Sequence, residues 1–236
     1  MEVRTLLKRG TDHPINCEDD LFTFNDGFTY IGAVFDGCST GIKSHFASAL
    51  YNKILTAYCK NLAPMYKGFT LEFIGRNIFK CIWNTLNEIK TTLYLDPLEM
   101  LSTMILTVIR DGQVYVLVSG DGCFYISDGE SGEETKIESP GNAPDYLAYH
   151  LADSFEAFQT IKEHTFKMQK TLSICSDGIY SFTDKDRKDV SNEVLTSLLD
   201  DESMLPSQAM LARKYNLLVK AGYTNYDDLS IVRFIL

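Results

Sequence analysis

The sequence has 236 residues, of which 45% are apolar, a composition typical of a folded chain, and we expect residues 1–236 to form a single domain. The net charge of −10 argues against nucleic acid as a partner, because a phosphate backbone would be repelled. No apolar run approaches the ~20 residues that span a bilayer, so no membrane association is expected.

The cysteines and the first residues bear on the cellular compartment. The segment MEVRTLLKRGTDHP lacks the apolar stretch and cleavage site of a secretory signal. None of the six cysteines forms a C-x-x-C pair, which argues against a structural zinc site. Together these features predict a cytoplasmic protein with reduced thiols.

The first third of the chain is predicted to contain two strands and then two helices. Residues 21–24 and 28–35 flank Asn25-Asp26-Gly27, a combination typical of a β-hairpin. Apolar residues then recur at helical spacing over 46–57 and again over 74–93. Both stripes indicate helices with one face toward a core.

The remainder is predicted to be rich in strands. Strand candidates are 102–110, 113–120, 123–127, 171–176 and 229–236. A helix is predicted over about 206–221, ended by Gly222. Because local hairpins outnumber β-α-β crossovers, we expect an α+β fold in which antiparallel sheets carry helices on the outside.

Asp-Gly pairs occur at six places and fall into two groups. Three pairs lie between strands and are typical of turns; they begin at Asp26, Asp111 and Asp128. The other three follow apolar strands and put a carboxylate at a sheet's rim; they begin at Asp36, Asp121 and Asp177. A hairpin turn competes with this interpretation most strongly at Asp121, because a strand resumes at Cys123.

Two more acidic groups flank strands: Glu18-Asp19-Asp20 precedes the first hairpin, and Asp227-Asp228 precedes the last strand. Carboxylates gathered at strand ends would repel one another unless cations neutralised them. Oxygen ligands select hard ions, which predicts Mg²⁺ or Mn²⁺ as cofactor. Two such ions about 4 Å apart can activate water and hold a transferring phosphoryl group.

These motifs, in this order, resemble the metal-dependent protein serine/threonine phosphatases of type 2C, the PPM family. The matching segments are CEDD (17–20), VFDG (34–37), SGDG (119–122), SDG (176–178) and DDLSIV (227–232). The resemblance implies a four-layer αββα sandwich of two antiparallel sheets flanked by helix pairs. It also implies hydrolysis of phosphoserine or phosphothreonine in a phosphoprotein substrate, such as that of a cognate serine/threonine kinase. The implied nucleophile is a hydroxide that bridges two Mg²⁺ or Mn²⁺ ions.

Carried over by position, the resemblance implies seven metal-binding residues: Glu18, Asp19, Asp36, Gly37, Asp121, Asp177 and Asp227. Asp36 would bridge both ions, Gly37 would offer its carbonyl oxygen, and Asp121 would help to hold a weaker third ion. The implied catalytic residues are Asp36, Asp19 and His13.

The sequence departs from the family pattern near the substrate. Cys38 stands where the family usually has His, and Pro14 stands where a phosphate-binding Arg is usual. The adjacent His13, in GTDHPINCEDD, makes this segment more similar to a compact bacterial branch. His13 would capture phosphate, act as a general acid, or simply cap the first strand. The short stretch between Asp121 and Asp177 predicts a reduced substrate flap.

Two alternative functions remain. A pseudophosphatase would keep the fold and bind a phosphoprotein or another partner without turnover; the missing His and Arg favour it, and the retained acids oppose it. A haloacid-dehalogenase-type hydrolase would need Asp-x-Asp and regular β-α-β order, and VFDGCST (34–40) has no second Asp at that spacing.

Overall fold

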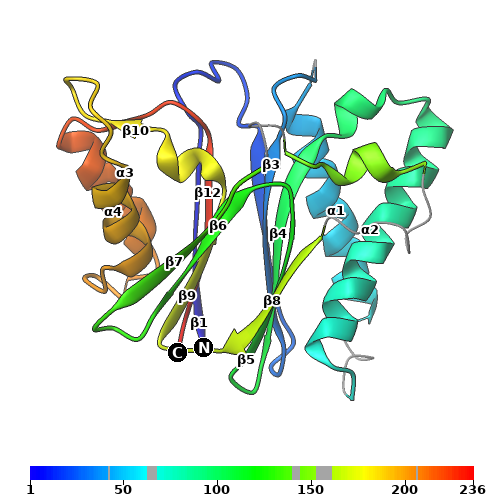
Figure 1. The fold of residues 1–236 in the computed structure, drawn as a ribbon, viewed down its shortest axis with the longest axis horizontal. Helices are drawn as coiled ribbons and strands as arrows, with labels where there is room; N and C mark the ends of the chain where they lie inside the picture. Colours follow the sequence, from blue (N-terminus) through cyan, green and yellow to red (C-terminus); the bar gives the residue numbers. More distant parts are fainter. Residues whose placement is uncertain (42, 63–67, 140–143, 153–160, 206) are drawn as a thin grey trace.

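The structure, a computed structural model, describes the chain except residues 42, 63–67, 140–143, 153–160 and 206. Two five-stranded antiparallel sheets lie face to face at its centre (Figure 1). The first sheet has the order β1 (Glu2–Lys8), β12 (Leu229–Ile235), β9 (Thr171–Cys175), β6 (Gly122–Ser127) and β7 (Gly132–Ile137). The second has the order β2 (Asp19–Asn25), β3 (Tyr30–Gly37), β4 (Ser102–Arg110), β5 (Gln113–Ser119) and β8 (Lys162–Lys167). A small separate sheet pairs β10 (Phe182–Thr183) with β11 (Thr224–Asn225).

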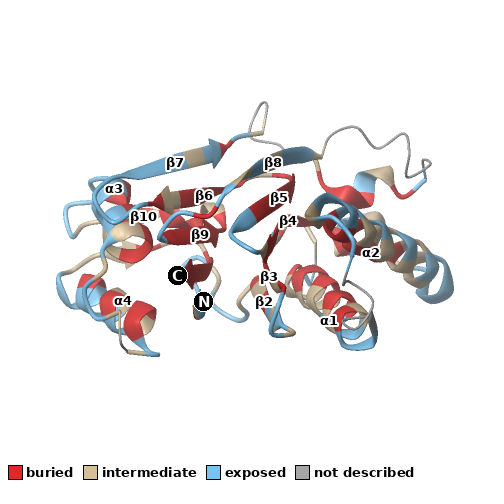
Figure 2. Cartoon of the chain, turned by 90° about the horizontal axis from the view of Figure 1, so that it is seen from below, coloured by how far each residue is buried: buried red, intermediate tan, exposed pale blue. Residues whose placement is uncertain are grey.

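Helices cover the outer face of each sheet, which makes four layers (Figures 1 and 2). The second sheet carries α1 (His45–Leu62) and α2 (Leu71–Leu93). The first sheet carries α4 (Met210–Lys220) and α3 (Ser191–Leu195), which continues into the π-helical turn η7 (Thr196–Asp200). The expected α+β fold, an αββα sandwich, is therefore confirmed. Among the described helices, none has the length and apolar character needed to cross a membrane.

The central strand β4 is buried on both faces, which explains its nearly continuous apolar sequence. Met104, Leu106 and Val108 belong to the core beneath α1 and α2. Ile105 and Ile109, which alternate with them, belong to the core between the two sheets. One strand thus holds three of the four layers together.

The two sheets approach closely where β3 lies against β12. A Cβ atom at Gly32 of β3 would lie 2.5 Å from the ring of Phe234 in β12. Only glycine leaves room for this contact. The close packing fixes β3, whose last two residues, Asp36 and Gly37, enter the site described below.

The three predicted Asp-Gly turns are confirmed. β2 pairs with β3 across a turn at residues 26–29, β4 with β5 across Asp111-Gly112, and β6 with β7 across a turn at residues 128–131. Asp111 and Gly112 both have positive φ angles, 50° and 70°, as a tight two-residue turn between twisted strands requires.

The predicted helix over 206–221 begins later than expected. Pro206 lies outside the described residues, and α4 starts only at Met210. The carbonyl oxygens of Leu205 and Ser207 accept hydrogen bonds from the buried guanidinium of Arg4, at 3.2 and 3.1 Å. Because these bonds tie the segment to β1, the helix begins after it. Gly222, with a φ of 96°, follows the end of the helix as predicted.

Candidate metal centre

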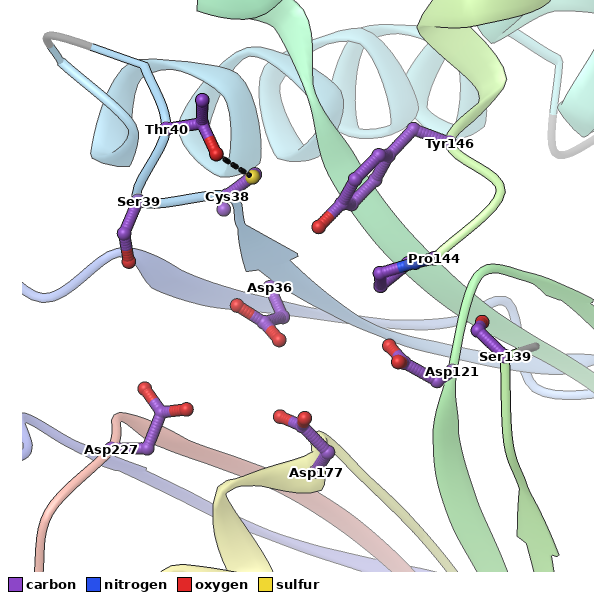
Figure 3. A pocket seen from close by; sticks show the side chains of 11 residues that line it. Asp36, Cys38, Ser39, Thr40, Asp121, Ser139, Pro144, Tyr146, Asp177 and Asp227 are labelled. Carbon is purple, nitrogen blue, oxygen red and sulfur yellow. Dashed lines mark hydrogen bonds between the residues drawn. The ribbon is translucent and has the colours of Figure 1, made fainter. Parts of the chain in front are cut away.

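A pocket of 460 Å³ lies at the ends of strands from both sheets, and carboxylates dominate it (Figure 3). Five of the seven predicted metal-binding residues line this pocket: Asp36, Gly37, Asp121, Asp177 and Asp227. The carboxylate oxygens of Asp36, Asp121 and Asp177 lie within 4.8 Å of one another. An oxygen-only donor set this compact suits a hard divalent cation.

Each carboxylate is positioned by the end of a strand. Asp36 is the penultimate residue of β3, and Asp227 lies just before β12. Asp177 begins the 3₁₀ helix η6 (Asp177–Tyr180), which follows β9 after one residue. Asp121 lies between β5 and β6, which belong to different sheets. Asp121 is therefore not in a hairpin turn; it marks the point where the chain crosses from one sheet to the other.

The crowding of these acids raises their pKa values. Burial, followed by the charges of Asp19 and Asp177, raises the pKa of Asp36 well above its ordinary 3.8. Burial and the charge of Asp177 raise the pKa of Asp121 to about 6. The pKa of Asp227 is also raised, again by burial first and by Asp177 second. Bound cations would reverse these shifts, so the electrostatics of the pocket fit a metal centre.

Asp19 lies directly opposite Asp36 in the β2–β3 ladder and is only 4% exposed. Its Oδ2 atom accepts a hydrogen bond from Ser176 Oγ at 2.7 Å. No hydrogen bond reaches its buried Oδ1 atom among the described residues, although the Ser230 side chain lies close enough to lower the pKa of Asp19. Burial raises the pKa of Asp19 to about 8. A buried carboxylate oxygen without a donor is what a nearby cation or its water shell would satisfy.

Gly37 is enclosed by backbone on two sides. Its N–H donates to the carbonyl of Glu18 at 3.1 Å. A Cβ atom at this position would lie 2.5 Å from the carbonyl oxygen of Ser44 and 2.7 Å from that of Glu18. Glycine is thus required by packing, whether or not its own carbonyl binds an ion.

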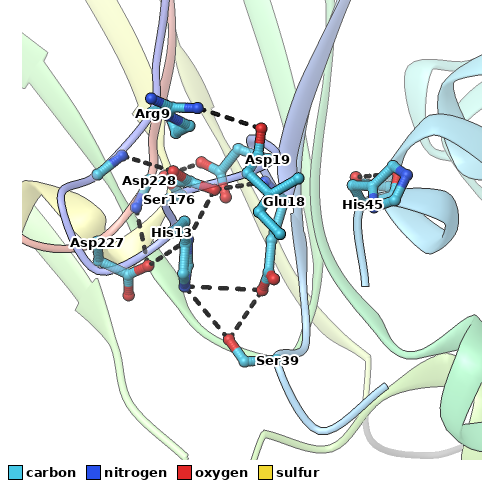
Figure 4. Close-up of polar contacts among 12 residues, drawn as sticks. Arg9, His13, Glu18, Asp19, Ser39, His45, Ser176, Asp227 and Asp228 are labelled. Atoms are coloured by element: carbon cyan, nitrogen blue, oxygen red, sulfur yellow. Dashed lines mark hydrogen bonds and ion pairs between the residues drawn. The ribbon is translucent and has the colours of Figure 1, made fainter. Parts of the chain in front are cut away.

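His13 and Glu18 line a neighbouring pocket of 370 Å³. His13 also reaches the carboxylate pocket, because its Nδ1 atom lies 3.7 Å from Oδ1 of Asp227 (Figure 4). Ser39 lines both pockets, and its Oγ donates to Glu18 Oε2 at 2.8 Å. His13 Nε2 lies 3.7 Å from the same Glu18 oxygen and 3.4 Å from Ser39 Oγ. His13 and Glu18 therefore lie beside Ser39, the residue that lines both pockets.

Asp228, a buried acid that the sequence placed before the last strand but to which it assigned no role, holds this arrangement together. Asp228 is 1% exposed, and its carboxylate accepts hydrogen bonds from the backbone N–H of Gly10, at 2.6 Å, and of Glu18. His13 Nδ1 lies 2.8 Å from Asp228 Oδ2, an ion-pair contact. Burial lowers the pKa of His13, but Asp228, Glu18 and Asp227 outweigh burial and raise that pKa above 6.5. The Asp227-Asp228 doublet was the available signal: Asp227 faces the carboxylate pocket and Asp228 anchors the loop before β2.

The two departures from the family pattern fall in different pockets. Cys38 lines the carboxylate pocket, where its thiol contacts Thr40 Oγ1 at 3.1 Å, and Pro14 lines the neighbouring one. The stretch expected to be a reduced flap lies partly outside the described residues, at 140–143 and 153–160. Its described part includes Tyr146, which sequence reasoning missed because no motif contains it.

A family model described as "Protein phosphatase 2C" matches residues 9–213. A bacterial serine phosphatase of solved structure matches with a TM-score of 0.71 at 15% identity, over 99% of this chain and 96% of that one. The serine/threonine phosphatase Stp1 from Staphylococcus aureus matches with a TM-score of 0.68 at 14% identity, over 100% and 94%. RsbX, solved in complex with magnesium, matches with a TM-score of 0.60 at 17% identity, over 98% and 94%. No curated protein matches the sequence.

The solved structures are too distant in sequence to show more than a shared fold. The family model carries the assignment, because its match over residues 9–213 covers most of the chain and includes the proposed site residues from His13 to Asp177. It ends before Asp227, whose place beside the other carboxylates comes from the geometry of the pocket. The chain belongs to the protein phosphatase 2C family, a family of metal-dependent protein serine/threonine phosphatases.

Proposed function

We propose that this chain, as a single domain, hydrolyses phosphoserine or phosphothreonine in proteins at a centre of two Mg²⁺ or Mn²⁺ ions, with room for a weaker third. The carboxylate pocket carries the proposal, because Asp36, Asp121 and Asp177 bring their oxygens within 4.8 Å of one another. Family membership supports the reaction, and the RsbX structure with magnesium supports the type of ion.

The proposed ligands fall into two groups. Asp36, Asp177, Asp227, Asp121 and the carbonyl of Gly37 would bind ions directly, since all five residues line the pocket. Asp19 and Glu18 do not line the pocket and would contact the second ion or its bound water, Asp19 through its buried Oδ1 atom. The ions would supply Lewis acidity, which activates water and neutralises charge on the phosphoryl group.

The protein's own contribution is to hold these groups rigidly. The β2–β3 ladder fixes Asp19 opposite Asp36, and Ser176 Oγ holds one oxygen of Asp19. Preorganised charge of this kind lowers the barrier without rearrangement during the reaction. Water would attack phosphorus in line with the departing oxygen, so no phospho-enzyme would form. His13 would act from the neighbouring pocket, where its Nε2 atom lies beside Ser39 and Glu18 and its Nδ1 atom lies 3.7 Å from Oδ1 of Asp227.

Manganese-dependent hydrolysis of p-nitrophenyl phosphate and of a phosphoserine peptide tests this function. We expect activity with Mn²⁺ or Mg²⁺, none with EDTA, and none after Asp36→Asn. Calorimetric binding of Mn²⁺ without turnover on either substrate would instead support the pseudophosphatase alternative. Turnover that persists in EDTA would contradict both functions.

A further inference from the structure

Tyr146 occupies the wall of the carboxylate pocket and is 8% exposed. Figure 3 shows its hydroxyl directed into the pocket, toward Cys38 and the carboxylate of Asp36. The residue directly precedes the 3₁₀ helix η4 (Leu147–His150). The fold does not require the hydroxyl group of Tyr146, since a phenylalanine ring would pack in the same space.

The segment that carries Tyr146 is held on several sides. Ser119 Oγ, at the end of β5, donates to the carbonyl of Asp145 at 3.3 Å. Leu147 and Ala148 are buried in the core beneath α1 and α2, and the Tyr146 ring belongs to the same core. Because its ring is packed and its neighbours are anchored, the Tyr146 hydroxyl has a fixed position in the pocket.

The phenol is neutral at physiological pH, because the ordinary pKa of a tyrosine hydroxyl is about 10. A neutral hydroxyl beside a phosphate-binding site offers one O–H donor and no competing negative charge.

Cys38 lines the same pocket, and its thiol is a weak hydrogen-bond donor. The thiol of Cys38 is moreover in contact with Thr40 Oγ1. Tyr146 reaches the same part of the pocket from the opposite wall (Figure 3).

We infer that Tyr146 contacts the substrate and that its hydroxyl donates a hydrogen bond, without losing its proton, to the oxygen that links phosphorus to the departing serine or threonine. This inference rests on the proposed phosphatase function. In hydrolysis the bond from phosphorus to that oxygen breaks, and water forms a new bond to phosphorus. The departing oxygen keeps the electron pair and gains one proton of the water, which leaves hydrogen phosphate and the free hydroxyl side chain. Tyr146 stabilises the negative charge that builds on this oxygen before the proton arrives.

The effect of this hydrogen bond on the rate depends on how much negative charge the departing oxygen carries. A serine alkoxide concentrates its charge on one oxygen, whereas p-nitrophenolate spreads its charge over the ring and the nitro group. The variant Tyr146→Phe removes the hydroxyl and keeps the ring. We expect kcat on a phosphoserine peptide to fall on the order of 100-fold. On p-nitrophenyl phosphate we expect a much smaller loss, with Mn²⁺ affinity by calorimetry unchanged.

Tyr149→Phe is the matched control. Tyr149 belongs to η4, the short helix that follows Tyr146, and its ring packs edge-on against that of Tyr146. It is 53% exposed and is not among the residues lining the pocket. It should behave as wild type on both substrates. Equal losses on the two substrates after Tyr146→Phe, or no loss on either, would overturn the inference.

A failure of the proposed function has a different signature, namely a wild-type protein that is inactive on both substrates. The phosphoserine peptide is then a stable ligand, and its affinity can be measured by calorimetry in the presence of Mn²⁺. Weaker binding of the peptide to Tyr146→Phe than to wild type and Tyr149→Phe would support the contact with the bridging oxygen. Equal binding by all three proteins would overturn it.

Discussion

Asp19 and Asp36 are paired directly across the β2–β3 ladder, both as carboxylates and both with raised pKa values. Like charges opposite each other in a sheet destabilise it. The charges of Asp177 and Asp227 add to the crowding at Asp36. The site is therefore assembled at a cost to stability that cations offset.

The metal-free protein should lose stability as pH rises from 5 to 8. Asp19 has a pKa of about 8 in the folded chain and 3.8 as its ordinary value. Between these pH values Asp19 holds a proton in the folded chain and has released it in the unfolded chain. The contribution of this difference to stability is complete below about pH 3.8 and is lost as the pH rises toward 8. The raised pKa values of Asp36 and Asp121 act in the same direction, and so does that of His13 above 6.5.

Urea unfolding in EDTA at several pH values measures this dependence. We expect the free energy of unfolding to fall by up to about 1.4 kcal/mol per pH unit for each proton involved. Saturating Mn²⁺ should flatten or reverse the slope, because cations bind the ionised carboxylates. A free energy that rises from pH 5 to 8 in EDTA would contradict the assigned crowding.

Asp36→Asn should abolish Mn²⁺ binding and hydrolysis while leaving the fold intact. The variant removes the central charge of the cluster, so the metal-free protein should unfold at an equal or higher temperature than wild type. Calorimetry with Mn²⁺ and a thermal melt in EDTA test the two parts. Unchanged Mn²⁺ affinity would rule out Asp36 as a shared ligand.

Asp26→Asn is the control for this substitution, because it changes the same residue type before a glycine in the same hairpin. Asp26 Oδ1 accepts hydrogen bonds from the N–H groups of Phe28 and Thr29, at 2.9 and 2.7 Å, and asparagine retains one such oxygen. We expect Mn²⁺ binding and activity to match wild type. A loss of metal affinity here would show that the β2–β3 turn, rather than the charge at Asp36, controls the site.

The strand-end carboxylates could be predicted because their signal is local. An apolar run that ends in Asp-Gly fixes both the strand and the acid, as at Asp36 and Asp177. The signal failed to separate Asp121 from a turn, since the crossing between two sheets looks locally like a hairpin. Only the pairing of β5 with β8 and of β6 with β9 resolves it.

Several elements had too weak a pattern to be found. The edge strand β8, KEHTFK, exposes its charged residues and buries little, so its apolar content is low. β1, EVRTLLK, is likewise an edge strand, and its Arg4 is buried only because the guanidinium bonds to carbonyls after η7. The five residues of α3 are too few for a helical period to show. Tyr146 enters the site through tertiary packing alone.

Cys38→Ser should retain turnover within a few-fold of wild type. The thiol of Cys38 lies in the carboxylate pocket, but the proposed reaction transfers the phosphoryl group directly to water. Serine keeps the contact with Thr40 Oγ1 through a smaller, stronger donor. Mass spectrometry of enzyme quenched during turnover should find no phosphate on residue 38. A covalent adduct at Cys38 would require a phospho-enzyme mechanism instead.

His13→Ala should weaken substrate capture more than it slows turnover. The imidazole is held by Asp228 through Nδ1, and its Nε2 edge faces Glu18 and Ser39 at the wall between the two pockets. Its raised pKa keeps part of the population cationic near neutral pH, which favours contact with phosphate. We therefore expect KM to rise several-fold, with a smaller change in kcat, and the pH dependence of KM to flatten.

His45→Ala is the matched control, because His45 lines the same neighbouring pocket from the first residue of α1. Steady-state kinetics from pH 5.5 to 8.5 on a phosphoserine peptide and on p-nitrophenyl phosphate separate the possible roles of His13. A fall in kcat confined to the peptide would make His13 a general acid rather than a phosphate ligand. Wild-type kinetics on both substrates, with a lower melting temperature, would leave His13 only the role of holding the loop before β2 against Asp228.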